Sequence, residues 1–524
     1  MKQILNIFRK DLRRYWRESA VSVALLVAYS WNDVRGWAGE RNVAAYGAIG
    51  GLISYQFLSG LVTVLLPVAW AFLIVRVVQA ETLVGDRQFW ITRPYEWKKL
   101  LAAKVLFVGF TINLPLLIAD VLLLAKAGFP PTHYVTGLLW MQLMMVLVLI
   151  LPIATLATVT ASVSQMMLAV LGVVLYMIGV AALASVIPSS GFSGPADSLD
   201  FILLIVTSVA VILWQYAQRK TSGSRWLIAV LALTVVLIIV ATPYNAIVKH
   251  DFPQLEPGEL LPVQMALLPA KTAADANVPD KEKEIVIQIP LSTSGVADDS
   301  IVVVSGVKVS LEAPNGLRWN SGWESPGISL FPDQKATQID FNLKRKFFER
   351  VKSYSVKARI ALALTVYRDK NRADFVTPPG EFAMPDLGFC SAGTYLREIH
   401  CRAPLRTPSS MLITSDLSAT TCPAREGESR ADNREIVRDW HQNSDSLAEF
   451  GISPVKNIDV YLWDRHDGAR RLVAGICPGT PLIISSPKFV RSTRMELEIN
   501  SLRLADYRLR QDEPGASGFG IVLH

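Results

Sequence analysis

Long stretches without charge limit what this chain can fold into more than any other feature. No Asp, Glu, Lys or Arg occurs between Arg41 and Arg76, a run of 34 residues, and none occurs in the 63 residues 134–196. A helix needs about 20 apolar residues to cross the roughly 30 Å hydrocarbon core of a bilayer. The first run is long enough for one crossing and the second for two. The sequence therefore predicts a polytopic α-helical membrane domain.

Residues 19–248 are predicted to form this domain, with about seven transmembrane helices. The polar patch 158–165 divides the longest uncharged run into two spans. The first span is the shortest, with only 14 uncharged residues. The predicted spans are residues 19–32, 56–78, 100–124, two segments within 134–196, 201–217 and 226–244.

The distribution of charge predicts how the chain is oriented. Residues 1–248 contain 18 basic and 10 acidic residues, whereas residues 249–524 contain 34 and 35. Short loops rich in Lys and Arg stay in the cytoplasm, and this topology assigns 15 of the 18 basic residues to cytoplasmic segments. The positive charge is thus explained without a nucleic-acid partner. We expect a multi-pass protein of the cytoplasmic (inner) membrane, with a cytoplasmic N-terminus and an extracytoplasmic (periplasmic) C-terminal domain.

Residues 1–18 predict an amphipathic helix at the cytoplasmic membrane interface. The apolar residues Ile4, Phe8, Leu12 and Trp16 recur every four positions, and basic residues occupy the other faces. This pattern is typical of a helix that lies at a membrane surface. Membrane lipid is therefore an expected partner.

The hydrophobic period changes to two in the C-terminal half. Residues 249–284, rich in Pro, Ala and charge, are predicted to be a linker. Beyond them, alternate residues are apolar in residues 301–311, 354–366, 458–462 and 495–499. Such strands bury one face, as in antiparallel sandwiches. In the first of these segments the expected buried set is Ile301, Val303, Val307, Val309 and Leu311.

Residues 285–524 are therefore predicted to form an all-β, immunoglobulin-like sandwich domain that follows the membrane domain. Turn signals at 314–316 and 467–468 separate the predicted strands. The region is long enough for one or two sandwiches, with a division near Pro378.

All cysteines of the chain lie in this C-terminal half. The four residues are Cys390, Cys401, Cys422 and Cys477. An even set confined to one domain is typical of disulfides in an oxidising compartment, and four cysteines permit three pairings. Four unpaired thiols in a reducing compartment are the alternative.

Catalytic and nucleotide-binding motifs do not occur in the sequence. We find no G-x-x-x-x-G-K-[ST], no H-E-x-x-H and no G-x-S-x-G. The six histidines are scattered, without the short spacing of metal ligands. We therefore predict that the chain is not an enzyme and binds no cofactor or metal itself. A membrane enzyme with an undescribed site is disfavoured for the same reason.

Asp120 is an acidic residue inside the third predicted span. Insertion scales assign a charged carboxylate at mid-membrane a cost of about 2.5–3.5 kcal/mol. One interpretation is a polar contact in a substrate path or between helices. The other is an acid near the outer end of the helix, because Lys126 follows six residues later.

Residues 79–104, QAETLVGDRQFWITRPYEWKKLLAAK, form a charged and aromatic island between the second and third spans. Its basic residues place it in the cytoplasm. An exposed loop with two large neighbouring aromatics, Phe89 and Trp90, needs a partner to cover them. The alternative is that both aromatics sit in the headgroup belt of the membrane.

The island resembles the corresponding loop in the membrane subunits of type-2 ATP-binding cassette (ABC) exporters. The resemblance covers about residues 1–220, and the chain departs from the family's six-span plan by a seventh span and a large outer domain. The features that match are Glu81, Gly85-Asp86-Arg87, Phe89-Trp90, Thr92-Arg93-Pro94 and the return into the membrane at 100–104.

The resemblance implies that a short coupling helix in residues 79–99 docks on a separate ABC ATPase subunit, which would bind ATP and Mg. It also implies a second permease subunit, either another copy of this chain or a sibling. The coupling residues that it implies are Glu81, Asp86, Arg87, Phe89, Trp90 and Arg93.

The predicted function is that of the transmembrane permease subunit of an ABC exporter, which moves a substrate across the membrane with ATP hydrolysed by another subunit. The alternative is a non-transport membrane scaffold or sensor, whose outer β domain binds a ligand or a partner protein.

Overall fold

The computed structural model covers residues 1–524 of the chain. The residues that it does not describe are 1, 38–48, 81–95, 187–193, 242–243, 256–258, 260, 270–283, 333, 370–371, 377–379, 385–387, 393–397, 406–409, 417–435, 443–451, 462, 467–468, 473–478, 480, 486 and 509–524.

The N-terminal half is helical. Its helices are α1 (Lys2–Arg14), α2 (Trp16–Gly36), α4 (Ile49–Gln79), α5 (Trp97–Val108), α6 (Leu114–Lys126), α7 (Val135–Met145), α8 (Leu151–Val159), α9 (Val163–Val186), α10 (Gly194–Gln218), α11 (Thr221–Ala241) and α12 (Tyr244–Asp251). The turn between α8 and α9 falls inside the predicted polar patch at 158–165.

Six helical stretches in the described residues are long and apolar enough to cross a membrane. They are Gly60–Gln79, Trp97–Lys126, Pro131–Val159, Val163–Leu183, Leu199–Gln218 and Thr221–Val240. A helical N-terminal half with several long apolar helices is thereby confirmed, and it is compatible with a multi-pass membrane protein. The predicted span at 19–32 lies within α2, which is not among the six because charges at both helix ends leave only a short apolar run. The count of seven remains a prediction.

Two of these stretches contain a π-helical turn that ends two positions before a proline. The π-helix η2 (Gly109–Asn113) precedes Pro115 of α6, and η4 (Val146–Ile150) precedes Pro152 of α8. Proline lacks the backbone N–H that continues an α-helix, and its ring crowds the preceding turn. A widened turn accommodates both effects without ending the helix.

The C-terminal half consists of antiparallel sheets. Its strands are β1 (Gln264–Leu267), β2 (Glu284–Ser294), β3 (Ser300–Glu312), β4 (Arg318–Asn320), β5 (Ile328–Leu330), β6 (Ala336–Lys344), β7 (Val356–Arg368), β8 (Arg372–Val376), β9 (Glu381–Met384), β10 (Gly388–Ala392), β11 (Glu398–Pro404), β12 (Ser410–Asp416), β13 (Ile436–Gln442), β14 (Val455–Tyr461), β15 (Trp463–His466), β16 (Ala469–Leu472), β17 (Pro481–Ser485) and β18 (Lys488–Leu502). The short helix α13 (Arg345–Val351) follows β6.

Two of the sheets enclose one apolar core. The sheet β18-β7-β3-β4, with β5 beside β3, packs on the sheet β1-β2-β6. Alternate residues of β7, from Val356 to Leu364, are fully buried in this core, as the two-residue period predicts. The all-β prediction is confirmed, whereas an immunoglobulin-like topology remains a prediction.

The expected buried set of β3 is only partly right. Val307, Val309 and Leu311 face the sandwich core, but Ile301 and Val303 pack on the other side of the sheet, next to Leu412 of β12. The pairing of β3 with β7 shifts between Val304 and Gly306. A β-bulge adds one residue and therefore reverses which alternate residues face the core.

The remaining sheets are inserted between β7 and β18. Although 119 residues separate them, β7 and β18 are antiparallel neighbours, and the ladder continues in β8 paired with β17. The sheets β13-β12-β17-β8 and β14-β11-β10-β9 are thus built from the chain between these two long strands.

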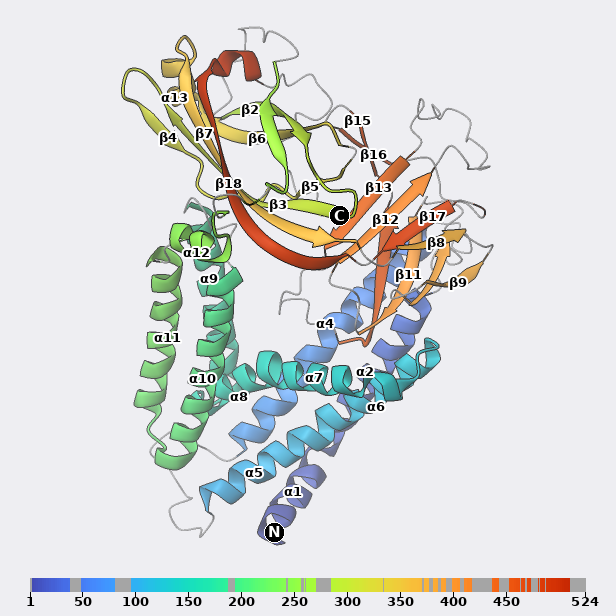
Figure 1. Cartoon of the computed structure of the whole chain (residues 1–524). Coiled ribbons are helices and arrows are strands. Elements are labelled where there is room, and N and C mark those ends of the chain that lie inside the picture. Colours follow the sequence, from blue (N-terminus) through green and yellow to red (C-terminus); the bar gives the residue numbers. More distant parts are fainter. Residues whose placement is uncertain are drawn as a thin grey trace.

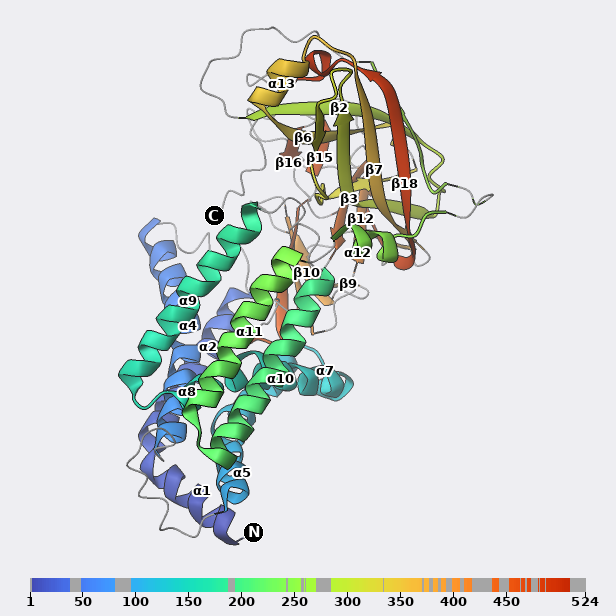
Figure 2. The same cartoon turned by 90° about the vertical axis from the view of Figure 1, so that its left-hand side faces the viewer.

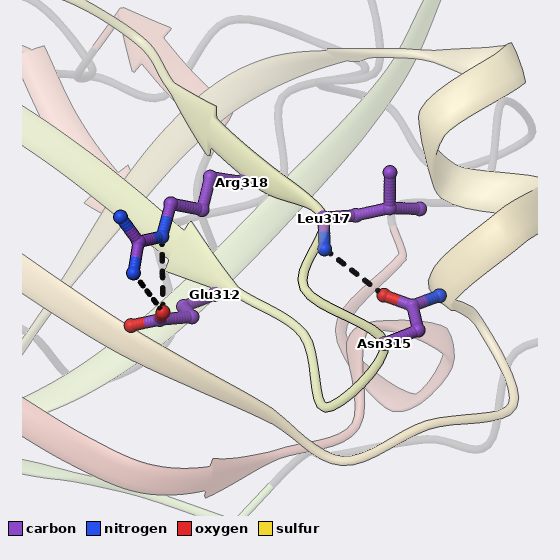
Figure 3. A network of polar contacts seen from close by, with 4 residues as sticks. All are labelled: Glu312, Asn315, Leu317 and Arg318. Carbon is purple, nitrogen blue, oxygen red and sulfur yellow. Dashed lines mark hydrogen bonds and ion pairs between the residues drawn. The ribbon is translucent and has the colours of Figure 1, made fainter.

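The predicted turn at 314–316 joins β3 to β4 (Figure 3). The Asn315 Oδ1 accepts a hydrogen bond from the Leu317 N–H at 3.2 Å, and Gly316 has a φ of 81°. Glycine adopts this backbone conformation without steric cost. Across the base of the turn, Arg318 forms an ion pair with Glu312 at 2.6 Å.

The strands lie at one end of the helical half, as both overall views show (Figures 1 and 2). The N-terminus, α1, the start of α5 and the α10–α11 turn lie at the opposite end. Helix α12 connects the halves, because its Val248 and the following Phe252 are buried against Trp323 and Ala363 of the β region.

Candidate functional site

The six predicted coupling residues lie outside the described residues. Glu81, Asp86, Arg87, Phe89, Trp90 and Arg93 all fall within 81–95. The structure does describe both flanks of this segment, which we call the coupling loop. The flanks are the end of α4 at Gln79 and the start of α5 at Trp97.

The α4 flank is hydrogen-bonded to the turn between α8 and α9. The Gln79 side-chain amide donates to the Thr160 Oγ1 at 2.9 Å and to the Thr160 carbonyl at 3.3 Å. The Thr160 hydroxyl in turn donates to the carbonyl of Leu156, inside α8. Thr160 is buried and its hydrogen bonds are partly buried, and together they attach the last turn of α4 to α8.

The α10–α11 turn is attached to the same place. The Arg225 guanidinium donates to the carbonyl of Val159 at 3.2 Å. Across the turn, the Ser224 hydroxyl of α11 donates to the Gln215 side chain of α10 at 3.0 Å, and both residues are fully buried. The end of α10 and the start of α11 thus meet the α8–α9 turn and the end of α4, beside the N-terminal flank of the coupling loop.

The α5 flank carries a buried ion pair. The Lys104 Nζ donates to the Asp11 Oδ2 of α1 at 2.8 Å, and the two side chains are only 4% and 2% exposed. Removing one member of a buried pair leaves an uncompensated charge and costs about 3–5 kcal/mol. Asp11 and Lys104 therefore hold α1 against α5, about two turns after α5 begins.

A second ion pair of this flank is exposed. Lys99 lies 2.9 Å from Glu96, the residue before α5. The hydrogen bond from Lys99, together with its charge, lowers the pKa of Glu96. An exposed pair of this kind contributes little to stability.

The apolar face predicted for α1 contacts protein. The Phe8 ring meets those of Phe107 and Phe110 edge-on, with centroids 6.5 and 5.5 Å apart. Ile4, Phe8 and Leu12 all pack on the helical core. Trp16 does not share this face, because α1 ends at Arg14, and its side chain is 58% exposed.

Asp120 lies in a polar chain within the helical half. Its Oδ2 accepts a hydrogen bond from the Gln142 amide at 3.0 Å, and the Gln142 Oε1 accepts one from Asn113 at 3.1 Å. Asp120 is fully buried, and within the described part of the chain its Oδ1 has no partner. These two hydrogen bonds link η2 and α6 to α7.

A second junction joins the helix ends to the β region. The Ser453 hydroxyl donates to the Asp33 carboxylate of α2 at 2.7 Å. The Phe129 and Phe389 ring centroids are 5.3 Å apart. A Cβ at Gly388 would approach the Phe129 ring to 2.9 Å and the carbonyl of Arg402 to 2.2 Å, so the close approach of β10 requires glycine here.

Arg402 of β11 sits at the centre of this junction. Its guanidinium lies 5.9 Å from the Trp37 ring and 5.8 Å from the Phe389 ring, and it forms an ion pair with Glu381. Burial lowers the pKa of Arg402, yet a guanidinium remains charged. The cation–π contacts of Arg402 thus attach β10 and β11 to Trp37, the residue that follows α2.

Cys390 and Cys401 form a disulfide between β10 and β11, the two strands of this junction. Each of the three possible pairings of the four cysteines contains two bridges, and this is one bridge of one such pairing. Cys422 and Cys477 lie outside the described residues.

Sequence reasoning did not identify the Asp11–Lys104 pair or the Asp33–Ser453 contact. A signal for the first was present, because Asp11 lies four residues after Ile7 and three after Phe8, on the apolar side of α1. A carboxylate on that side needs a buried partner. The described residues contain no group of three or more His, Cys, Asp or Glu side chains that could hold a metal ion.

Comparisons with known proteins add no assignment. No family model matches the sequence, and no curated protein does. Among solved structures, the chain is similar to red sea bream transglutaminase at 9% identity and a TM-score of 0.13, covering 46% of this chain and 31% of that protein. A similarity of this strength carries no argument about fold or function.

Proposed function

We propose that the chain is the transmembrane permease subunit of an ABC exporter, with ATP and Mg bound by a separate ATPase subunit. The supporting observation is that both flanks of the coupling loop are attached to other helices, one by part-buried hydrogen bonds and the other by a buried ion pair. Gln79 is bonded to the α8–α9 turn, and Lys104 is paired with Asp11 of α1. A displacement of the loop would therefore move several helices together.

The sequence of the coupling loop supplies the docking surface in this proposal. Phe89 and Trp90 would fill a pocket on the ATPase, since buried aromatics dominate interface energies. Asp86 and Arg93 would lie at the rim and set orientation. Seven spans would then place the β region outside the cytoplasm. A second permease subunit would pack on helices that are largely uncovered, such as α9 and α11.

The test is co-purification of an ABC ATPase with the full chain. Replacing Phe89→Ala and Trp90→Ala together should reduce its recovery at least tenfold, because truncating one anchoring aromatic often costs roughly 2 kcal/mol or more. The matched control is Tyr354→Ala with Phe489→Ala, which truncates two exposed aromatics of the β region. Equal recovery of the ATPase with wild type and the loop variant would show that Phe89 and Trp90 are headgroup-belt residues.

The alternative function, a membrane scaffold or sensor with a ligand-binding β domain, has one observation in its favour. The Asp33–Ser453 bond and the Arg402 cluster could pass a change in the β region to α2. Absence of any ATPase from the purified wild-type protein, with the chain folded, would favour this function.

A further inference from the structure

Helix α1 carries a continuous basic face on the side away from α5. Lys2, Leu5, Arg9 and Arg13 are three or four residues apart, so they share one side of the helix. All four are exposed. We define the basic face of α1 as the exposed residues Lys2, Arg9, Lys10, Arg13, Arg14 and Arg17, the last at the start of α2.

The opposite side of α1 is not free to enter a membrane. Ile7 and Asp11 are 7% and 1% exposed, and Phe8 contacts the aromatic rings of α5 and η2. Interfacial helices usually bind membranes by burying an apolar face. In α1 that face is already covered by protein, so the surface left for an external partner is the basic one.

No acidic side chain of α1 offsets this charge. Asp11 is the only acidic residue of the helix, and its carboxylate is neutralised inside the protein by Lys104. The next acid along the chain, Glu18 of α2, is half-buried. The basic face therefore presents six cationic side chains toward whatever covers it.

Two exposed apolar residues accompany the cations. Leu5 is 45% exposed and Trp16 is 58% exposed, and the Arg17 guanidinium lies 5.7 Å from the Trp16 ring. Tryptophan with neighbouring Arg is typical of the headgroup level of a membrane. Clusters of roughly four to eight Lys and Arg beside a membrane helix attract anionic lipids.

We propose that the basic face of α1 binds the phosphate headgroups of anionic phospholipids at the end of the helical half that carries the N-terminus. Because Asp11 and Lys104 join α1 to α5, the bound lipid holds the start of α5, and with it the coupling loop, at a fixed depth. This consequence for the coupling loop rests on the proposed function, whereas the lipid site itself does not.

The experiment measures which lipids the full chain retains. Wild-type protein is purified from bilayers of equal parts phosphatidylglycerol and phosphatidylcholine with identical acyl chains, and the retained lipids are quantified by mass spectrometry. The test variant combines Arg9→Gln, Lys10→Gln, Arg13→Gln and Arg14→Gln. The matched control combines Lys335→Gln, Lys344→Gln, Lys346→Gln and Arg350→Gln, which removes the same charge from exposed positions of the β region.

We expect wild type and control to be enriched in phosphatidylglycerol, and the test variant to lose this enrichment at least tenfold. A third variant, with Arg9, Arg13 and Arg14 replaced by Lys, keeps the charge and should keep the enrichment. Salt at about 1 M shortens the screening length to roughly 3 Å and should weaken the enrichment of wild type.

Equal enrichment in wild type and the test variant would overturn the proposal, as would equal losses in the test variant and the control. A test variant that keeps its lipid but loses an ATPase would identify the face as a protein-docking surface, which also overturns it. Lipid retention needs no ATPase. Loss of phosphatidylglycerol in the test variant, with no ATPase recovered from wild type, would support the lipid site and remove the exporter proposal.

Discussion

Ser453 donates a hydrogen bond of 2.7 Å to Asp33, although 420 positions separate the two residues in the sequence. Asp33 lies in the last turn of α2, and Ser453 lies just before β14. The Ser453 Oγ also accepts a hydrogen bond from the Val455 N–H, which orients the hydroxyl toward α2. The contact makes the end of α2 and the β14 segment one structural unit.

Replacing Ser453→Ala should loosen this unit. A hydrogen bond to a charged group contributes about 1.5–3 kcal/mol, and its loss leaves a half-buried carboxylate with one partner fewer. We expect faster proteolysis of the full chain near the β14 segment and a lower midpoint of thermal unfolding. Ser355→Ala serves as the control, because the Ser355 hydroxyl bonds only to the exposed hydroxyl of Ser501 within the described residues. Equal effects of the two variants would contradict a specific role for Ser453.

The Asp11–Lys104 pair gives a prediction about stability. Lys104→Met leaves the Asp11 carboxylate buried without its cation, and we expect a loss of about 3–5 kcal/mol in the free energy of unfolding. The double variant Asp11→Leu with Lys104→Met should recover most of that loss, since an apolar pair avoids the desolvation penalty. The measurement is a double-mutant cycle on purified protein.

The exposed pair next to it is the control for this cycle. Glu96→Gln with Lys99→Gln removes an ion pair of similar length, but one that water already screens. No measurable change in stability is expected. Additive losses in the Asp11–Lys104 cycle would mean that the two residues do not interact in the folded protein.

The sequence predicted the parts of the fold that a local period specifies. Uncharged runs located the helices, because their length suits a membrane span. The alternation at 354–366 located β7, because it reports which face of the strand is buried. The division of the longest run at the polar patch 158–165 is also matched by the turn after α8. These features depend only on neighbours in the chain.

Contacts between distant segments were beyond such reasoning. The bulge at Val304–Gly306 reversed the phase of β3. Gly306 is the residue type that suggests a bulge, but a glycine alone does not fix the register of the strand with its neighbour. The sequence places Lys104 where the basic island returns into the membrane and predicts no partner for it, whereas it is buried against Asp11, 93 positions earlier. Pairing across such distances depends on how whole elements pack, which a local pattern does not encode.

The disulfide gives a prediction that extends the sequence argument. Peptide mapping under non-reducing conditions should recover Cys390 joined to Cys401. Replacing both with Ser should destabilise the β region by roughly 2–4 kcal/mol, because the unfolded chain then regains the freedom of the closed loop. The readout is the thermal midpoint with and without a reductant, and only wild type should respond to reduction at this bond. Free thiols at both positions in the native protein would contradict the structure.

Lys308 predicts a dependence of stability on alkaline pH. Burial lowers its pKa, and the charge of Lys249 on α12 lowers it further, whereas Glu496 raises it. A lysine with a lowered pKa in the folded state favours its neutral form there, so folding is relatively disfavoured below that pKa. Stability should therefore rise with pH from the lowered pKa up to the ordinary value of 10.5.

Lys308→Met should remove this rise and stabilise the protein at pH 7. The measurement is the unfolding midpoint of full-length protein between pH 7 and 10. Lys357→Met, an exposed lysine of β7, is the control and should leave the profile unchanged. A rise of equal size in wild type and the Lys308 variant would show that another group titrates.

The last prediction separates docking from transmission at the coupling loop. Gln79→Leu removes both hydrogen bonds to Thr160 but leaves Phe89 and Trp90 in place. An ABC ATPase should therefore co-purify as it does with wild type. Its ATP hydrolysis in the complex should respond less to the permease, by about 5-fold or more if the contact carries at least 1 kcal/mol of coupling.

Thr160 supplies the matched pair of variants for this test. Thr160→Val removes the Oγ1 acceptor and should weaken coupling in the same direction as Gln79→Leu, whereas Thr160→Ser keeps the hydroxyl and should behave as wild type. The measurement is ATP hydrolysis by the purified complex relative to the ATPase alone. If Gln79→Leu leaves this ratio unchanged while Phe89→Ala with Trp90→Ala abolishes binding, the coupling loop docks the ATPase, but the α8–α9 turn takes no part in transmission.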